Sequence, residues 1–279
     1  MNKLKLRLQL EQFFLEDIGD RDVTSELIFG EAEKGKVVFI AKEHGVFCGG
    51  EVIRQGFAIL DPRIKVEMTA KDGEMIEKGQ VIAEAKGAVT DLLKGERVIL
   101  NLVQRMSGIA TQTREAVSVL NSSLTKICDT RKTTPGLRML EKYAVRCGGG
   151  YNHRFGLYDA VMIKDNHISF AGTITKAVEA VRSSIGHMVK VEVETETKAQ
   201  VQEAVIAKAD VIMFDNRQPS EIKEWIQYVP KGIITEASGG ITLENLAAYR
   251  ETGVDYISLG FLTHSVKSLD ISVKVIIED

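Results

Sequence analysis

Aromatic residues make up only 6% of this 279-residue chain, which also has only three cysteines and four prolines. The cysteines, Cys48, Cys128 and Cys147, form no CxxC or Cys/His metal motif. Thiols this sparse exclude a disulfide-stapled secreted domain and indicate reduced cysteines in a cytoplasmic protein.

The chain also lacks a long uninterrupted hydrophobic run. Its N-terminus, MNKLKLRLQLEQFF, alternates charges with leucines and has neither the apolar core of a signal peptide nor the length of a membrane span. The formal charge of -3 gives no cationic surplus for general binding to nucleic acid or to a membrane surface. A cluster of cations in this sequence therefore indicates a local site.

Hydrophobic residues, 44% of the chain, follow two different patterns. Up to about residue 120 the sequence predicts a hairpin over 36–50, a helix over 49–60, strands within 63–87, and two or more helices over 90–120. Helical stretches then separate six apolar segments of strand length, at 125–129, 160–164, 190–194, 211–215, 233–238 and 256–260. This alternation predicts an α/β fold whose parallel strands close into a barrel.

Polar residues stand at the end of all six segments: Asp129 and Arg131, Lys164, Glu194, Asp215, Ser238 with Gly239, and Gly260. Catalytic groups of α/β barrels gather at this carboxyl end of the strands. Six such ends in series therefore predict an active site there.

The first of these ends lies in ICDTRKTTPGLR, residues 127–138, which holds two adjacent cations and three hydroxyls. Arg131 and Lys132, with His153 and Arg154 further on, adjoin strand ends or a glycine turn, whereas Lys142 and Arg146 are spaced as on a helix surface. Arginine presents a planar fork to carboxylates and lysine a point charge to phosphates. The pattern favours a substrate with several anionic groups.

Glu194 and Asp215 end consecutive strands at matching depth in the sequence, so their carboxylates could converge on one divalent cation. Oxygen ligands and few protein contacts are typical of magnesium shared with a phosphorylated substrate. The turns EASGGI (236–241) and SLGFLTH (258–264) end the last two strands, a frequent phosphate site in such barrels.

Together these stretches resemble a known family. DTRKTTPGLRMLEKYAVRCGGGYNHRFGLYDAVMIKDNHI, residues 129–168, closely resembles the signature region of the quinolinate phosphoribosyltransferases. The similarity continues in EDIGDRDVT (16–24), ERVILNLVQRMSGIAT (96–111), VEVE (191–194), FDN (214–216), EASGGI and LTHSVKSLDIS (262–272), and so spans nearly the whole chain. Arg21 departs from the glycine expected in the family's early acidic turn.

The resemblance implies an N-terminal α/β sandwich domain, residues 1–108, to which residues 268–279 return, and an incomplete six-stranded α/β barrel, residues 109–267. It implies a magnesium-dependent reaction in which quinolinate attacks C1 of phosphoribosyl pyrophosphate and the adduct loses carbon dioxide, giving nicotinate mononucleotide. It also implies a homodimer or higher homo-oligomer, because Arg97 matches the family arginine that reaches into a neighbouring subunit's site.

The matching positions imply the role of each residue. Those implied to bind quinolinate are Arg97, Thr130, Arg131, His153, Arg154 and Lys164. Those implied to bind phosphoribosyl pyrophosphate are Lys132, Glu194, Asp215, Asn216, Ser238, Gly239, Gly240, Gly260, Phe261, Leu262 and His264. Glu194 and Asp215 are the implied ligands of Mg²⁺, and the implied catalytic residues are Lys132, Lys164, Glu194 and Asp215.

Three alternatives remain open. The first is a paralogue on the same scaffold that acts on another acid. The second is a Schiff-base aldolase using Lys164. The third is a non-enzymatic protein, either a phosphometabolite sensor or a lipoyl-like carrier, since KDGEMIEKGQVIAEAKG (71–87) has the strand–turn rhythm of carrier domains and Lys86 as the candidate lysine.

Overall fold

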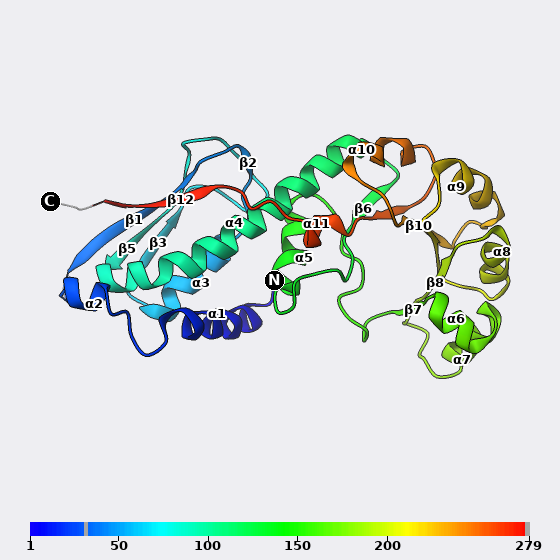
Figure 1. Ribbon diagram of the computed structural model, residues 1–279, viewed down its shortest axis with the longest axis horizontal. Coiled ribbons are helices and arrows are strands. Elements are labelled where there is room, and N and C mark those ends of the chain that lie inside the picture. The colour runs from blue at the N-terminus through cyan, green and yellow to red at the C-terminus, as the bar shows by residue number, and fades with distance from the viewer. Residues whose placement is uncertain (31–32, 277–279) are drawn as a thin grey trace. The chain divides into compact units, whose positions relative to one another are not determined.

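The computed structural model describes residues 1–30 and 33–276, so residues 277–279 of the expected returning segment lie outside it. The chain forms two compact units (Figure 1). The first comprises Met1–Arg114, Met139–Gly149 and Val266–Asp279, and the second comprises Glu115–Arg138 and Gly150–Ser265. No helix of the described residues is both long enough and apolar enough to cross a membrane.

The first unit is built on a four-stranded antiparallel sheet in the order β12-β1-β5-β3. Its strands are β1 (Lys34–Ala41), β3 (Lys65–Met68), β5 (Val81–Ala88) and β12 (Ile271–Ile276), and a short pair joins β2 (Gly45–Val46) to β4 (Met75–Ile76). Its helices are α1 (Lys3–Ile18), α2 (Ser25–Ile28), α3 (Gly50–Leu60), most of α4 (Val89–Leu120) and most of α5 (Arg138–Cys147).

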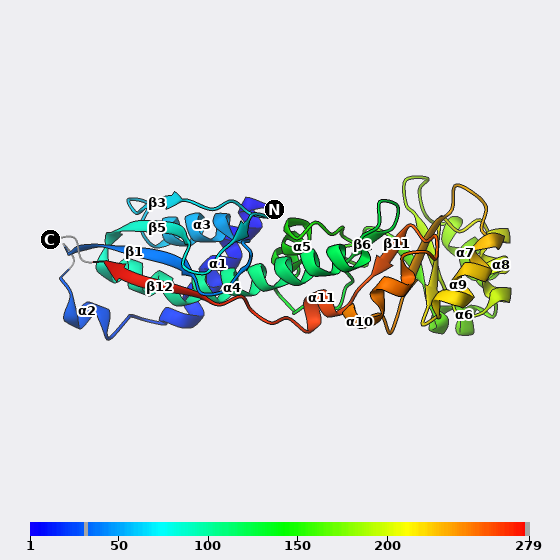
Figure 2. The same ribbon diagram turned by 90° about the horizontal axis from the view of Figure 1, so that it is seen from above.

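The core of this unit forms where α1, α3 and α4 pack together and against the sheet (Figures 1 and 2). Helix α1 buries one face, on which Leu6, Leu10 and Phe14 recur at helical spacing. Phe57 of α3 meets Phe39 of β1 edge to face, with ring centroids 6.2 Å apart. Helices that precede and follow the strands in the sequence therefore cover the sheet (Figures 1 and 2).

Three expectations for this unit are wrong. Strand β1 pairs with β5 and β12 rather than with β2, so residues 36–50 form no hairpin. Residues 90–120 form a single helix, because its internal glycines lie at close packing contacts and do not end it. Lys142 is fully buried beside Glu141, which Arg105 of α4 binds at 2.7 Å, so only Arg146 lies on the helix surface.

We expect Gly108→Ala to destabilise the protein, although alanine is the better helix former. A Cβ atom at residue 108 would lie 2.2 Å from the backbone oxygen of Lys267, which cannot rotate away. The clash should outweigh the gain in helix propensity, which is about 1 kcal/mol. The free energy of unfolding should therefore fall by about 2 kcal/mol. Urea unfolding measures it, with Gly95→Ala as the matched control, because that Cβ meets only the side chains of Leu60 and Phe57. A stabilised Gly108→Ala protein would contradict this expectation.

The second unit contains a six-stranded parallel sheet in the order β6-β11-β10-β9-β8-β7. Its strands are β6 (Lys126–Cys128), β7 (Val161–Ile163), β8 (Val191–Thr195), β9 (Val211–Asp215), β10 (Ile234–Ser238) and β11 (Tyr256–Ser258). Its helices are α6 (Asp165–Ala171), α7 (Ile174–Arg182), α8 (Lys198–Ile206), α9 (Pro219–Trp225), α10 (Leu243–Leu246) and α11 (Phe261–His264). The predicted α/β class, with an N-terminal sandwich and a six-stranded barrel, is confirmed.

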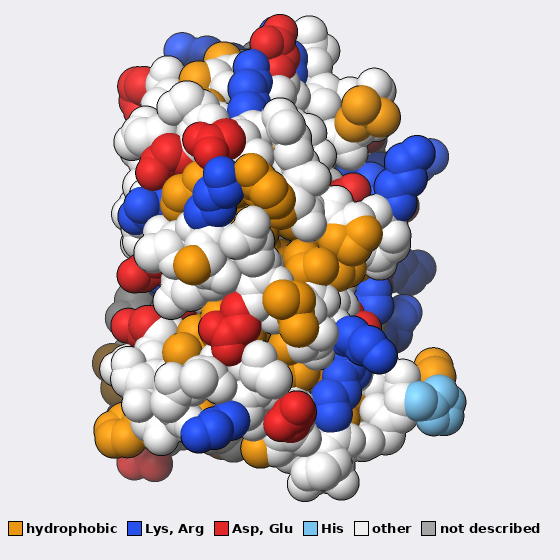
Figure 3. Space-filling view, turned by 90° about the vertical axis from the view of Figure 1, so that its right-hand side faces the viewer, with side chains coloured by type: hydrophobic (Ala, Val, Ile, Leu, Met, Phe, Trp, Pro, Cys, Tyr) orange, Lys and Arg blue, Asp and Glu red, His pale blue; other side chains and the backbone are white. Residues whose placement is uncertain are grey.

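Helices cover the outside of this sheet, and the barrel remains open at one seam. Figure 3 shows the outer face, where side chains of both charges lie among hydrophobic ones. Within the described residues β6 and β7 do not pair. Instead Tyr151 bridges to β6: its N–H donates to the Ile127 carbonyl at 2.8 Å, and its carbonyl accepts the Asp129 N–H at 3.1 Å. The segment that leads to His153 is thereby fixed at the seam.

Candidate active site

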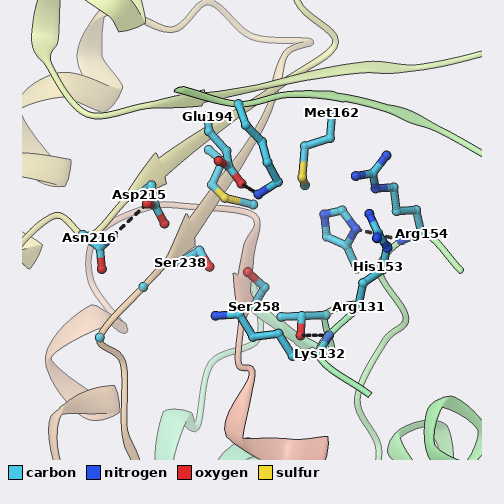
Figure 4. A pocket seen from close by; sticks show the side chains of 15 residues that line it. Arg131, Lys132, His153, Arg154, Met162, Glu194, Asp215, Asn216, Ser238 and Ser258 are labelled. Carbon is cyan, nitrogen blue, oxygen red and sulfur yellow. Dashed lines mark hydrogen bonds and ion pairs between the residues drawn. The ribbon is translucent and has the colours of Figure 1, made fainter. Parts of the chain in front are cut away.

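A pocket of about 340 Å³ opens at the carboxyl ends of the barrel strands. Figure 4 shows Glu194, Asp215 and Asn216 on one side of it and Arg131 and Arg154 on the other. Residues predicted from the sequence form most of its lining: Thr130, Arg131, Lys132, His153, Arg154, Lys164, Glu194, Asp215, Asn216, Ser238, Gly239 and Gly240. Met162, Met213 and Ser258 complete it and were not predicted.

The remaining predicted residues lie outside this lining. Gly260 borders it indirectly, because a Cβ at this position would lie 3.1 Å from Cδ of Lys132 and 3.1 Å from Cδ2 of His264. Leu262 is fully buried, so only its backbone could contact a ligand. Phe261 is the first residue of the same short helix, α11. Arg97 lies on α4 in the first unit, and its role stays a prediction.

Two guanidinium groups form the cationic end of the pocket. Arg131 has its Nε atom buried, with no hydrogen-bond partner among residues 1–30 and 33–276. Arg154 donates from Nη1 to the Ala160 carbonyl at 2.8 Å. Burial lowers the pKa of Arg154, and neighbouring Arg131 lowers it further. Two partly desolvated cations side by side are stabilised when an anion lies between them.

Asp129 holds the backbone of this end in place, a role that the sequence interpretation missed. Its buried carboxylate accepts the N–H of His153 at 2.9 Å and the side-chain amide of Asn152 at 2.6 Å. The Arg154 N–H in turn donates to Nδ1 of His153 at 2.8 Å, which assigns the ring proton to Nε2. The sequence did contain one signal of this role, because Asp129 is an acidic residue placed between a buried strand and a run of cations.

A carboxylate pair lies inside the barrel below the pocket. Nε2 of His153 is 3.0 Å from Oε2 of Glu192 and 3.7 Å from Oε2 of Glu236, and both glutamates are buried. Burial raises the pKa of Glu236 to about 8, and the charge of Glu192 adds to the increase. The sequence interpretation missed this pair, although both glutamates interrupt otherwise apolar strands.

We expect the stability of the protein to fall as the pH rises through the titration of Glu236. Its pKa in the folded protein, about 8, lies above the ordinary value of 4.5, so the folded state binds the proton more tightly. Stability is therefore fully present below the ordinary value and is lost as the pH rises toward the folded value. Glu236→Gln should retain a few kcal/mol more than the wild type over this window, measured by urea unfolding. If the stability of wild type and variant depended equally on pH, the expectation would be contradicted. Glu224→Gln, which changes an exposed glutamate, is the control.

Lys164 and two carboxylates form the opposite end of the pocket. The Lys164 ammonium donates to Oε1 of Glu194, and Asn216 donates to Oδ2 of Asp215 at 2.7 Å. Burial raises the pKa of Glu194, and the bond from Lys164 opposes this effect. Glu194 pairs in register with Met213, so Asp215 lies two residues further along its strand, and the expected matching depth is wrong. Both carboxylates nevertheless line the pocket.

The turn after β10 brings backbone close to this acidic end. Gly239 and Gly240 have φ values of 84° and 65°, which favour glycine. A Cβ at Gly239 would lie 2.3 Å from Oδ1 of Asn216 and 2.8 Å from its backbone nitrogen. The turn therefore requires glycine at this position for both its conformation and its space.

Family models of known proteins match both parts of the chain. Residues 22–107 match the family model of the quinolinate phosphoribosyl transferase N-terminal domain, and residues 109–274 match that of the C-terminal domain. The chain is 59% identical over 275 residues to the probable nicotinate-nucleotide pyrophosphorylase (carboxylating) of Bacillus subtilis (strain 168), covering 99% of this chain and 95% of that protein.

Solved structures resemble the whole chain. NadC from Streptococcus pyogenes superposes with a TM-score of 0.96 at 40% identity, covering 100% of this chain and 99% of that one. The nicotinate-nucleotide pyrophosphorylase from Francisella tularensis gives a TM-score of 0.93 at 36% identity, covering 99% of this chain and 97% of that one.

Proposed function

Because the chain belongs to the quinolinate phosphoribosyltransferase family, we propose that its barrel pocket binds quinolinate and phosphoribosyl pyrophosphate together. The enzyme transfers the phosphoribosyl group to quinolinate with loss of carbon dioxide, giving nicotinate mononucleotide and pyrophosphate in de novo NAD biosynthesis. The observation that carries the site assignment is the pairing of a double-guanidinium end with an acidic end across one pocket.

The cationic end is the proposed site for quinolinate, which is a dicarboxylate. Arg131 and Arg154 are partly desolvated and lie close enough for their charges to interact. A carboxylate between them accepts the forked N–H donors of both groups. Thr130 completes this end, and Lys164 is proposed to contact quinolinate from the opposite end. His153, held by Asp129, forms the wall between the pocket and the barrel interior.

The acidic end and the glycine turn are the proposed site for phosphoribosyl pyrophosphate. Ser238 and the exposed turn at Gly239 and Gly240 present short side chains and backbone to a phosphate. Lys132, which packs near Gly260 and His264, supplies a positive charge for the departing pyrophosphate. The proposed site extends beyond Lys132 to the backbone of Gly260, Phe261 and Leu262.

The donor set at the acidic end fits magnesium. Glu194 and Asp215 offer carboxylate oxygens from adjacent strands, and both line a further hollow of about 100 Å³ with Asp165 and Glu196. Hard oxygen donors with room for water and phosphate oxygens match the preference of this ion. Bound there, Mg²⁺ would neutralise charge on the pyrophosphate. The Lys164 ammonium donates to Glu194 at this end.

Positioning and electrostatics supply the chemical step. Charge develops on the ribose as the pyrophosphate departs, and the fixed carboxylates of Glu194 and Asp215 stabilise that positive charge. Once alkylated, the ring nitrogen is cationic and stabilises the carbanion left by the departing carboxylate. Holding the two substrates in line then accounts for much of the acceleration.

The assembly and location of the enzyme are further proposals. Arg97 would complete the site of a second copy, which makes a homodimer the smallest active unit. The three sparse cysteines suit a reducing cytoplasm. Small-molecule substrates, rather than nucleic acid or membrane, would be the partners of this pocket.

The alternatives are less well supported by the geometry. A Schiff-base lysine must lose its proton, whereas the Lys164 ammonium is bound to a carboxylate. Lys86 lies within β5, opposite Lys36 and Lys65, and not at the tip of a hairpin as in a carrier domain.

Incubation of the purified protein with quinolinate, phosphoribosyl pyrophosphate and magnesium tests the function. We expect nicotinate mononucleotide, identified by mass, and no product with nicotinate in place of quinolinate. Product from nicotinate alone would instead indicate a paralogue. A borohydride-trapped adduct on Lys164 would favour the aldolase.

A further inference from the structure

The first unit holds a second cluster of reactive side chains, formed by Cys48, Cys147, Asp72 and Tyr143. Cys48 lies just before α3, and Cys147 is the last residue of α5. The two sulfur atoms and one carboxylate oxygen of Asp72 all lie within 4.8 Å of one another. The proposed transfer reaction uses none of these residues.

Asp72 is already committed to other partners. Its Oδ1 atom accepts the backbone N–H groups of Gly49 and Gly50, each at 2.9 Å, and its Oδ2 atom accepts the Tyr143 hydroxyl at 2.7 Å. A cation bound by this carboxylate and the thiols would have to compete with those donors. A bond between the two sulfur atoms leaves all three hydrogen bonds intact, so the cluster favours thiol chemistry over metal binding.

The two cysteines differ in the way that a reactive thiol differs from its resolving partner. The Cys48 thiol hydrogen-bonds to Cys147 and thereby holds the pKa of Cys147 below its ordinary value. Burial raises the pKa of Cys48, which is 0% exposed, whereas Cys147 is only half-buried. An oxidant arriving from solvent therefore reaches Cys147 first, and the lowered pKa favours its thiolate form.

We propose that Cys48 and Cys147 are a modification site, a redox pair that peroxide converts reversibly into a disulfide. The Cys147 thiolate attacks one oxygen of hydrogen peroxide; a sulfur–oxygen bond forms, the oxygen–oxygen bond breaks, and hydroxide leaves as water after protonation. Cys48 sulfur then attacks the sulfenic sulfur, and the second oxygen leaves as water with the Cys48 proton. Two thiols lose two electrons in total, and one peroxide becomes two waters.

The disulfide joins two helix ends that are distant in sequence. Cys48 is fixed by Ser107, whose hydroxyl accepts its N–H at 3.0 Å and donates to its carbonyl at 3.1 Å. Cys147 leads into Gly148, whose carbonyl accepts Nε of Arg114 at 3.0 Å. Both cysteines thus sit on braced backbone, which favours an intramolecular bond over one between molecules.

The test treats the full-length wild-type protein with hydrogen peroxide, then unfolds it, alkylates it and maps its peptides. We expect loss of two of the three thiols, a Cys48–Cys147 cross-link within one chain, and full recovery with dithiothreitol. Cys48→Ser should instead leave a sulfenic acid at Cys147 that dimedone traps. Cys128→Ser, in β6 of the second unit, is the matched control and should still form the cross-link.

Either of two results would overturn the proposal. The first is that all three thiols survive peroxide in the wild type. The second is that the disulfide involves Cys128 or joins two molecules. The readout uses no transferase assay, so it stands or falls independently of the proposed function.

Discussion

Arg131→Ala is expected to lower kcat/KM for quinolinate by about a hundredfold or more, which corresponds to about 3 kcal/mol of transition-state stabilisation. The side chain has a buried Nε atom without a hydrogen-bond partner in the described part of the chain, so it is placed to receive an anion. Its removal leaves Arg154 as the remaining guanidinium of the cationic end. Steady-state kinetics with each substrate varied in turn measure the effect.

The controls separate charge, shape and folding. Arg131→Lys keeps the charge but loses the planar fork, so most of the loss should remain. Arg182→Ala removes an arginine of outer helix α7 that pairs with Asp210 at 2.6 Å, and it should leave kinetics unchanged. Lys132→Ala should mainly lower kcat, because its charge is proposed to stabilise the departing pyrophosphate. Unchanged quinolinate kinetics in a folded Arg131→Ala protein would remove this residue from the site.

Chelation of magnesium is expected to abolish turnover. The variants Glu194→Gln and Asp215→Asn should each raise the half-saturating Mg²⁺ concentration by tenfold or more, which corresponds to a loss of about 1.4 kcal/mol in the free energy of metal binding. Each variant replaces a charged oxygen ligand with a neutral one in a shallow site that has few protein ligands. Glu194→Gln also releases the Lys164 ammonium from its carboxylate. Magnesium titrations of activity measure the shift, and binding of Mn²⁺ in the presence of phosphoribosyl pyrophosphate provides a readout independent of turnover.

A matched control for this pair is Glu224→Gln on α9, an exposed carboxylate that binds Lys198. It should leave the metal dependence unchanged. Equal metal dependence of wild type, Glu194→Gln and Asp215→Asn would refute the assignment of the acidic end. It would not affect the quinolinate end, which the arginine variants test separately.

Apolar runs of strand length, separated by helical stretches, were sufficient to predict the barrel strands. Each strand from β6 to β11 begins and ends within two residues of a predicted segment. The reason is local: buried parallel strands need continuous apolar runs, and polar residues mark the edge where each strand leaves the core. That same edge predicted most of the pocket, from Thr130 to Gly240.

Partners distant in sequence explain where the predictions were wrong. Strand β2 pairs with β4 and not with the adjacent β1, because β1 is already bonded on both sides by β5 and β12. Helix α4 continues through Gly95 and Gly108 because neighbouring groups pack where a side chain would lie. Neither constraint is present in the local sequence.

The sequence by itself determined the family, the parallel barrel and the identity of the charged residues at its carboxyl end, because strand period and strand-end chemistry are local properties. Only the tertiary structure decided which groups meet inside the barrel and at its seam. There Asp129 fixes the backbone of His153, and Glu192 and Glu236 share one buried space. These contacts join strands that lie far apart in the chain, and burial, which raises the pKa of Glu236, exists only once the barrel has formed.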